Sequence, residues 1–69
     1  MNMISVASKN IAAIGYDGGV LYIKFKSGSL HKYSNVPQHV YGAFISADSK
    51  GRYYNAHIRG RYEKSIKLI

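Results

Sequence analysis

Cationic and aromatic side chains alternate over residues 50–62, and this basic segment carries the clearest chemical signal in the chain. The last twenty residues hold six of the ten Lys and Arg side chains but only one acid, Glu63. Cationic groups neutralise phosphates, and tyrosine rings stack on nucleic-acid bases. The segment therefore predicts a non-catalytic nucleic-acid-binding module. The predicted contact residues are Lys50, Arg52, Arg59 and Arg61 for phosphates, with Tyr33 or Tyr62 for stacking.

The other titratable residues form no recognisable metal centre or catalytic motif. The chain has no cysteine, and His31, His39 and His57 lack the spacing of metal-ligating motifs. Three acids are too few for metal-assisted phosphodiester chemistry. We therefore expect no metal, no cofactor and no enzymatic activity. One catalytic alternative stays open, which is metal-free RNA cleavage by general acid–base action of His31 or His57.

A formal charge of +7 on 69 residues predicts attraction to polyanions. RNA, DNA, an anionic membrane surface or an acidic protein face would each fit, and a solvated surface that confers solubility is the simpler alternative. No apolar run approaches the ~18 residues that span a bilayer, and the N-terminus lacks the regions of a signal peptide. We expect a cytoplasmic protein without membrane insertion, folded as a single domain over residues 1–69.

A protein-interaction module is the second functional hypothesis. A domain of this length has a small core, and a protein partner or a second copy would bury additional apolar surface. Ile66, Leu68 and Ile69 place apolar side chains in the tail. On this hypothesis the chain is a phage accessory factor that docks on an acidic host protein, or it forms a small homo-oligomer.

Alternating apolar residues and turn signals predict an antiparallel β-meander in the first half of the chain. The predicted strands cover residues 3–7, 11–16, 20–26 and 29–33. Asp17-Gly18-Gly19 is a strong hairpin-turn signal, and Ser27-Gly28 turns the chain again.

The turn at Ser27-Gly28 leaves two registers open. A two-residue turn would pair Phe25 with Leu30 and Tyr22 with Tyr33, and Tyr33 would then be partly exposed. One face would carry Leu21, Ile23, Phe25 and Leu30, and the other would carry Tyr22, Lys24, His31 and Tyr33. A bulged turn would shift the pairing by one residue and change which side chains share a face.

Two short helices are predicted after Pro37, and a C-terminal edge strand over residues 62–69 completes an α+β fold. The first helix would begin at Pro37 with a cap from Ser34 or Asn35, and the second would begin after a Ser49 cap. The apolar stripes predicted to face the sheet are Val40, Tyr41, Phe44 and Ile45, then Tyr53, Tyr54, His57 and Ile58.

Segments along most of the chain match one family pattern: Ser8-Lys9-Asn10-Ile11, Ile14-Gly15-Tyr16-Asp17, Phe25-Lys26-Ser27-Gly28, Val36-Pro37, Val40-Tyr41 and residues 47–58. In this order and spacing they resemble the KTSC domain, a small domain also found at the C-terminus of some lysyl-tRNA synthetases. The resemblance spans residues 3–62. It implies a short stand-alone bacterial or phage protein, for which the synthetase context suggests RNA binding. The chain departs from the family's central Tyr-x-Tyr at His31-Lys32-Tyr33, which weakens a strict stacking role for this pair.

Overall fold

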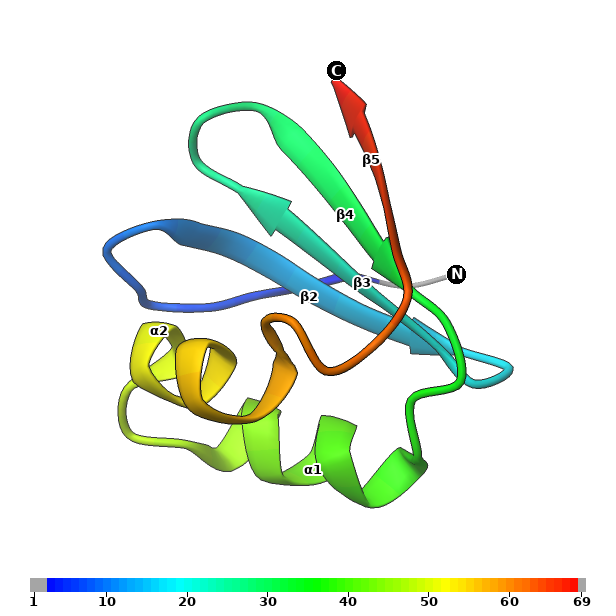
Figure 1. The fold of residues 1–69 in the computed structure, drawn as a ribbon. Helices are drawn as coiled ribbons and strands as arrows, with labels where there is room; N and C mark the ends of the chain where they lie inside the picture. Colours follow the sequence, from blue (N-terminus) through cyan, green and yellow to red (C-terminus); the bar gives the residue numbers. More distant parts are fainter. Residues whose placement is uncertain (1–2, 69) are drawn as a thin grey trace.

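Five antiparallel strands and a helical layer build the fold (Figure 1). The computed structural model describes residues 3–68, with the side chains of residues 3–65. The sheet follows the chain order through β1 (Met3–Ser5), β2 (Ile11–Asp17), β3 (Val20–Phe25), β4 (Ser29–Tyr33) and β5 (Lys64–Leu68). The predicted α+β meander and its C-terminal strand are confirmed, and the first strand is shorter than predicted.

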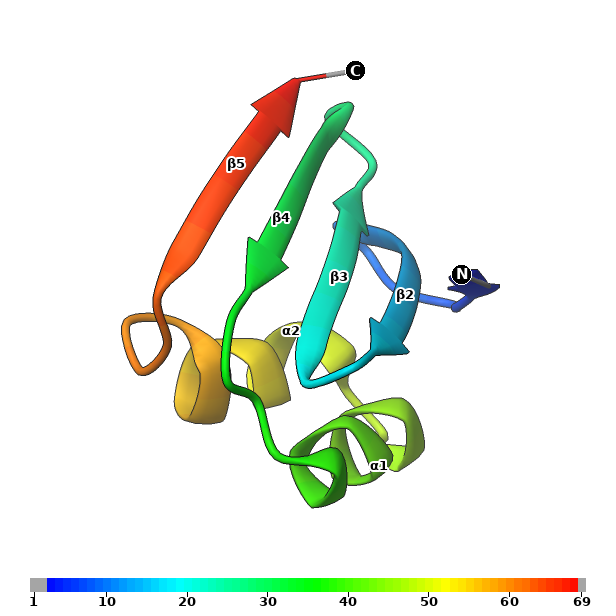
Figure 2. The ribbon, with the colours of Figure 1, turned by 90° about the vertical axis from the view of Figure 1, so that its right-hand side faces the viewer.

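The helical segments lie on one side of the sheet (Figures 1 and 2). They are α1 (Gln38–Ser46), α2 (Lys50–Tyr53) and the π-helical turn η1 (Tyr54–Ile58), which continues α2 without a break. The core lies between these segments and the sheet. Its buried side chains are Ile11, Ile14, Leu21, Ile23, Tyr33, Val36, Val40, Phe44 and Ile58.

The start of α1 differs from the prediction. Pro37 directly precedes the helix with an extended backbone, and no side chain caps it. The predicted cap from Ser34 or Asn35 was wrong, because Asn35 has a left-handed φ of 57° and turns the chain instead. Val36 then donates its backbone N–H to the Gly19 carbonyl at 2.9 Å, which anchors the entry into α1 on the β2–β3 turn.

The pairing of β3 with β4 follows the bulged alternative. Leu21 pairs with Tyr33, and Ile23 pairs with His31. Leu21 and Ile23 are buried against the helices, so Tyr33 and His31 share the helix-facing side of the sheet. Leu30 pairs with Lys24 on the opposite face. Of the two registers that the sequence leaves open, the structure therefore has the bulged one, shifted by one position from the two-residue turn.

The cause of this shift is the conformation of the β3–β4 turn. Gly28 has a positive φ of 104° and donates its N–H to the Phe25 carbonyl at 3.0 Å. A turn followed by one residue of positive φ is the three-residue hairpin loop with a bulge, which pairs the strands one position away from a two-residue loop. The turn thus determines that the Tyr33 ring lies in the core.

Candidate functional site

The junction of α1 and α2 is fixed by two side-chain bonds. Ser49 Oγ accepts the backbone N–H of Arg52 at 3.2 Å, which confirms the predicted cap. Lys50 Nζ donates to the Ala47 carbonyl at 2.6 Å, directly after the end of α1. These bonds hold the backbone of Arg52 close to the end of α1.

A π-helical turn ends the helical part of the basic segment. The backbone N–H of Arg59 donates to the Tyr54 carbonyl, five residues earlier, at 2.8 Å. An α-helix would form this bond between residues four apart, so the turn is wider than predicted. Ile58 is buried and His57 is exposed. The prediction that His57 belongs to the sheet-facing apolar stripe was wrong, because its side chain is exposed and packs on the Tyr53 ring.

A pocket of about 310 Å³ opens between the end of α1 and the outer side of α2 and η1. Its wall is partly aromatic, because the rings of Tyr53 and His57 lie 4.5 Å apart at 35°. Tyr53 also stacks on the buried Phe44 ring at 5.6 Å, so the core supports this wall. The residues that line the pocket are Ala47, Asp48, Ser49, Arg52, Tyr53, Ala56 and His57. We call this site the junction pocket.

Three of the predicted cationic residues contact the junction pocket or its walls. Arg52 lines it directly. Arg61 Nε donates to the Ala56 carbonyl at 3.1 Å, and Lys50 Nζ donates to the Ala47 carbonyl. A guanidinium has five N–H donors and an ammonium has three, so both groups retain donors beyond these bonds. Arg52 is thus the predicted cation that lines the pocket, whereas Lys50 and Arg61 each bond the backbone carbonyl of a residue that lines it.

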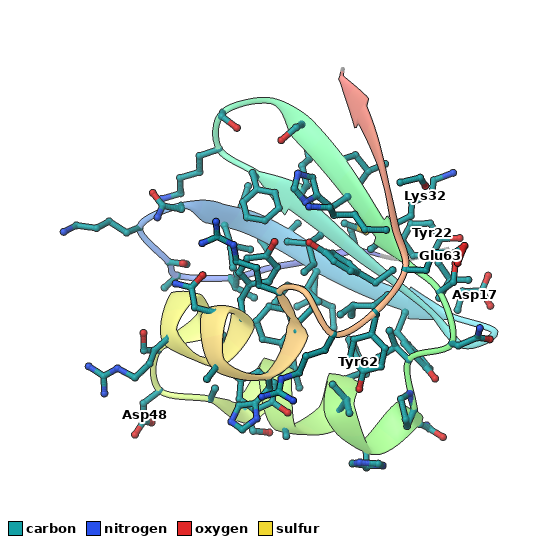
Figure 3. All side chains as sticks on the ribbon, viewed as in Figure 1. Asp17, Tyr22, Lys32, Asp48, Tyr62 and Glu63 are labelled. Atoms are coloured by element: carbon teal, nitrogen blue, oxygen red, sulfur yellow. The ribbon has the colours of Figure 1, made fainter. Side chains whose placement is uncertain are left out.

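The acidic residues are distributed unevenly around this site. Figure 3 shows Asp48 at the α1–α2 junction, whereas Asp17 and Glu63 lie at the opposite end of the molecule. Asp48 is the carboxylate that borders the junction pocket. Tyr62 lies away from Asp48 in the same view and packs half-buried against the core. The structure thus does not bring the predicted stacking residue Tyr62 to the pocket.

Tyr33 and Arg59 belong to a different cluster, on the sheet side of the helical segment. The Tyr33 side chain is 0% exposed. Burial and the hydrogen bond to the Tyr54 hydroxyl raise the pKa of Tyr33, and the positive charge of Arg59 opposes this rise. The predicted stacking role of Tyr33 was wrong, because the bulged register turns its ring into the core. Arg59 is exposed but acts on this hydroxyl, and it does not line the junction pocket.

A hydrogen-bonded chain of three side chains ties β4 to η1. His31 Nδ1 lies 3.0 Å from the Tyr33 hydroxyl, which lies 2.6 Å from the Tyr54 hydroxyl. The Phe25 ring packs 4.4 Å from the His31 ring. Burial, followed by the positive charge of Lys64, lowers the pKa of His31. A neutral imidazole keeps one acceptor nitrogen, so the tyrosine hydroxyls and this ring can satisfy one another.

The histidines of the open catalytic alternative lie in different clusters. His31 belongs to the hydrogen-bonded chain between β4 and η1, whereas His57 lines the junction pocket. Among the residues that the structure describes, no three His, Asp or Glu side chains gather in a way that could hold a metal ion. Within the same residues, no helix has the length and apolar character needed to cross a membrane.

Comparison with known proteins places the chain in a family. A model of the KTSC domain matches residues 7–62. The chain belongs to the KTSC domain family. The crystal structure of a KTSC domain protein from Yersinia pestis is 33% identical, with a TM-score of 0.86 over 99% of this chain and 96% of that one.

Two bacterial relatives support the assignment to the KTSC family. An uncharacterized protein from Stutzerimonas stutzeri is 37% identical over 57 residues, which cover 80% of each chain. A protein from Tsukamurella paurometabola is 34% identical over 62 residues, which cover 87% of this chain and 92% of the relative. The matched range, residues 7–62, includes every residue that lines the junction pocket. The pocket is therefore part of the KTSC domain of this chain.

Proposed function

We propose that this KTSC domain is a non-catalytic module that binds single-stranded RNA through the junction pocket. The observation that carries the proposal is the meeting of Arg52 with the aromatic wall of Tyr53 and His57 in one open pocket. Arg61 is held beside it through the Ala56 carbonyl. Arginine recognises phosphate and also lies over bases, and aromatic rings stack on bases.

The charge of the protein supports an anionic ligand. The chain has ten Lys and Arg residues but three acidic residues. Two of the acids, Asp17 and Glu63, lie at the end of the molecule opposite Asp48. Two phosphate contacts on a single strand, one each from Lys50 and Arg61, would give a slope of about −1.4 for log K against log salt. Each such contact contributes roughly fivefold to affinity near 0.1 M salt. RNA binding is thus expected to weaken steeply as salt is added.

The aromatic wall favours a single strand over a duplex. Bases in an RNA duplex are stacked on one another, whereas loops and single strands present base faces to protein rings. RNA is preferred to DNA because of the lysyl-tRNA synthetase context of the family resemblance. A cytoplasmic location fits this ligand.

Fluorescence anisotropy with a labelled single-stranded RNA of about ten nucleotides, across a salt series, tests the proposal. The test variant is Arg52→Glu/Arg61→Glu, and the matched control is Lys24→Glu/Lys26→Glu, whose residues are also exposed but lie at the β3–β4 turn. Both variants lower the net charge by the same amount. We expect a loss of roughly 25-fold for the pocket variant near 0.1 M salt, and a much smaller loss for the control. Equal losses would show that only the overall charge matters.

Self-association is a second candidate function, supported by the edge of the sheet. β1 is an edge strand, and its Ile4 side chain is 47% exposed. An open edge with an exposed apolar side chain favours pairing with another chain. Light scattering after size-exclusion chromatography should show a dimer that Ile4→Lys disrupts, and a monomer at all concentrations would reject the candidate. The apolar tail residues Ile66, Leu68 and Ile69 lie outside the described side chains.

A further inference from the structure

We infer that the junction pocket receives one unpaired base of the RNA strand and selects guanine. This inference rests on the proposed RNA binding and adds a base preference to it. Four features of the pocket support it: its volume, its aromatic wall, the guanidinium of Arg52 and the carboxylate of Asp48.

The size and wall of the pocket suit a single planar ring system. Its volume of about 310 Å³ is at the lower end of the ~300–1,000 Å³ range of ligand pockets, so one base fits better than several. The rings of Tyr53 and His57 offer an aromatic surface that Phe44 supports from the core. Single-strand-binding proteins use such surfaces to stack bases.

Guanine matches the polar groups of the pocket on two of its edges. Its O6 and N7 atoms form a pair of acceptors that suits the planar N–H fork of arginine. Its N1–H and N2–H₂ groups form a pair of donors on another edge, and a carboxylate has two oxygens that accept them. Arg52 and Asp48 line the same pocket and supply these two complementary groups.

Each of the other three bases can form only some of these hydrogen bonds with Arg52 and Asp48. Adenine places an amino donor beside N7, which opposes the donors of Arg52. Cytosine and uracil have no N7, and uracil offers Asp48 a single N3–H donor. The phosphates next to the bound base are then left to Arg61 and Lys50, which flank the pocket.

Atom-level analogues of guanine test the two edges separately. The probe is a labelled oligouridylate of about ten nucleotides with one central guanosine. It is compared with strands that carry inosine, which lacks the N2 amino group, or 7-deazaguanosine, which lacks N7, and with the all-uridine strand. We expect binding to weaken roughly fivefold with each analogue and further with uridine alone, the lower end of the discrimination of bidentate contacts.

Two pocket variants link each edge to its residue. Asp48→Asn removes the acceptor carboxylate and a negative charge, so affinity for the all-uridine strand should rise and the preference for guanosine over inosine should disappear. Arg52→Lys keeps the charge but loses the planar fork, so the preference for guanosine over 7-deazaguanosine should disappear. If each residue acts only on structure or overall charge, its variant will change the affinity of all strands by one factor.

The outcomes separate this inference from the proposal on which it rests. Equal affinity of the unmodified protein for the guanosine, inosine and uridine strands would overturn the guanine preference and leave RNA binding intact. No binding of any strand at low salt would overturn both.

Discussion

The two sides of the helical segment formed by α2 and η1 have similar side chains but different roles. On the sheet side, Tyr54 contacts Tyr33 of β4, Ile58 is buried in the core, and Arg59 lies near the Tyr33 hydroxyl. On the outer side, Arg52 and His57 line an open pocket. Each side of the helical segment therefore has a tyrosine, a histidine and an arginine on it or in contact with it. Alternating basic and aromatic residues therefore do not define a binding surface by themselves, because the strand register and the position of each residue on the helical segment decide which of them are exposed.

Adjacent substitutions at positions 57 and 58 should separate the two sides most strongly. Ile58→Ala removes a fully buried side chain and should lower the free energy of unfolding by about 2–5 kcal/mol. His57→Ala changes an exposed side chain and should stay within about 0.5 kcal/mol. Urea denaturation followed by circular dichroism measures both. Similar losses for the two variants would contradict the burial of Ile58 and the exposure of His57.

Removing the central hydroxyl of the buried chain is expected to have the next largest effect. Tyr33→Phe leaves the Tyr54 hydroxyl and His31 Nδ1 without their shared partner, which should cost about 1–3 kcal/mol of stability. Tyr22→Phe is the matched control, because its half-buried ring lies near the Lys32 ammonium on the opposite face of the sheet. We expect the control to remain within about 0.5 kcal/mol in the same denaturation experiment.

The stability of the sheet side should also depend on pH through His31. Burial and Lys64 lower the pKa of His31 below 6.5, so the unfolded chain binds the proton first as pH falls. The neutral His31 ring contributes fully to the stability of the fold above the pKa that His31 has in the unfolded chain. This contribution is lost as the pH falls from there through the lower pKa of His31 in the folded protein.

Urea midpoints measured between mildly acidic and neutral pH test this contribution. His31→Gln should flatten the dependence in that range, whereas His39→Gln, at an exposed position of α1, should retain it. Identical pH profiles for the two variants would contradict the lowered pKa of His31.

The order of the elements was predictable from the sequence, but the contents of the site were only partly so. Alternation in residues 20–26 and the turn at Asp17-Gly18-Gly19 determine the hairpins, and Ser49 caps α2 as its position implied. The register depended on the φ of Gly28, since a serine–glycine pair is compatible with either loop length. One residue of shift then moved Tyr33 from the predicted surface into the core.

The π-helical turn and the junction pocket could not be predicted from the sequence. The backbone bond from the Arg59 N–H to the Tyr54 carbonyl replaces an α-helical bond, and neither residue type indicates a π-helical turn at this place. The pocket depends on how α1 packs against α2, because this packing brings Asp48 and His57 to one pocket. The hydrophobic periodicity of the sequence does not indicate how the two helices pack. Arg52 and Arg61 were identified from charge alone, and Asp48 was not included in the predicted site.

The most direct test compares RNA binding by Arg52→Glu and Arg59→Glu. The two variants make the same charge change seven positions apart, one in the junction pocket and one beside the buried chain. We predict that Arg52→Glu weakens binding to single-stranded RNA by at least roughly fivefold near 0.1 M salt, whereas Arg59→Glu has a clearly smaller effect. Equal effects of the two variants, or a larger effect of Arg59→Glu, would contradict RNA binding at the outer side of the helical segment.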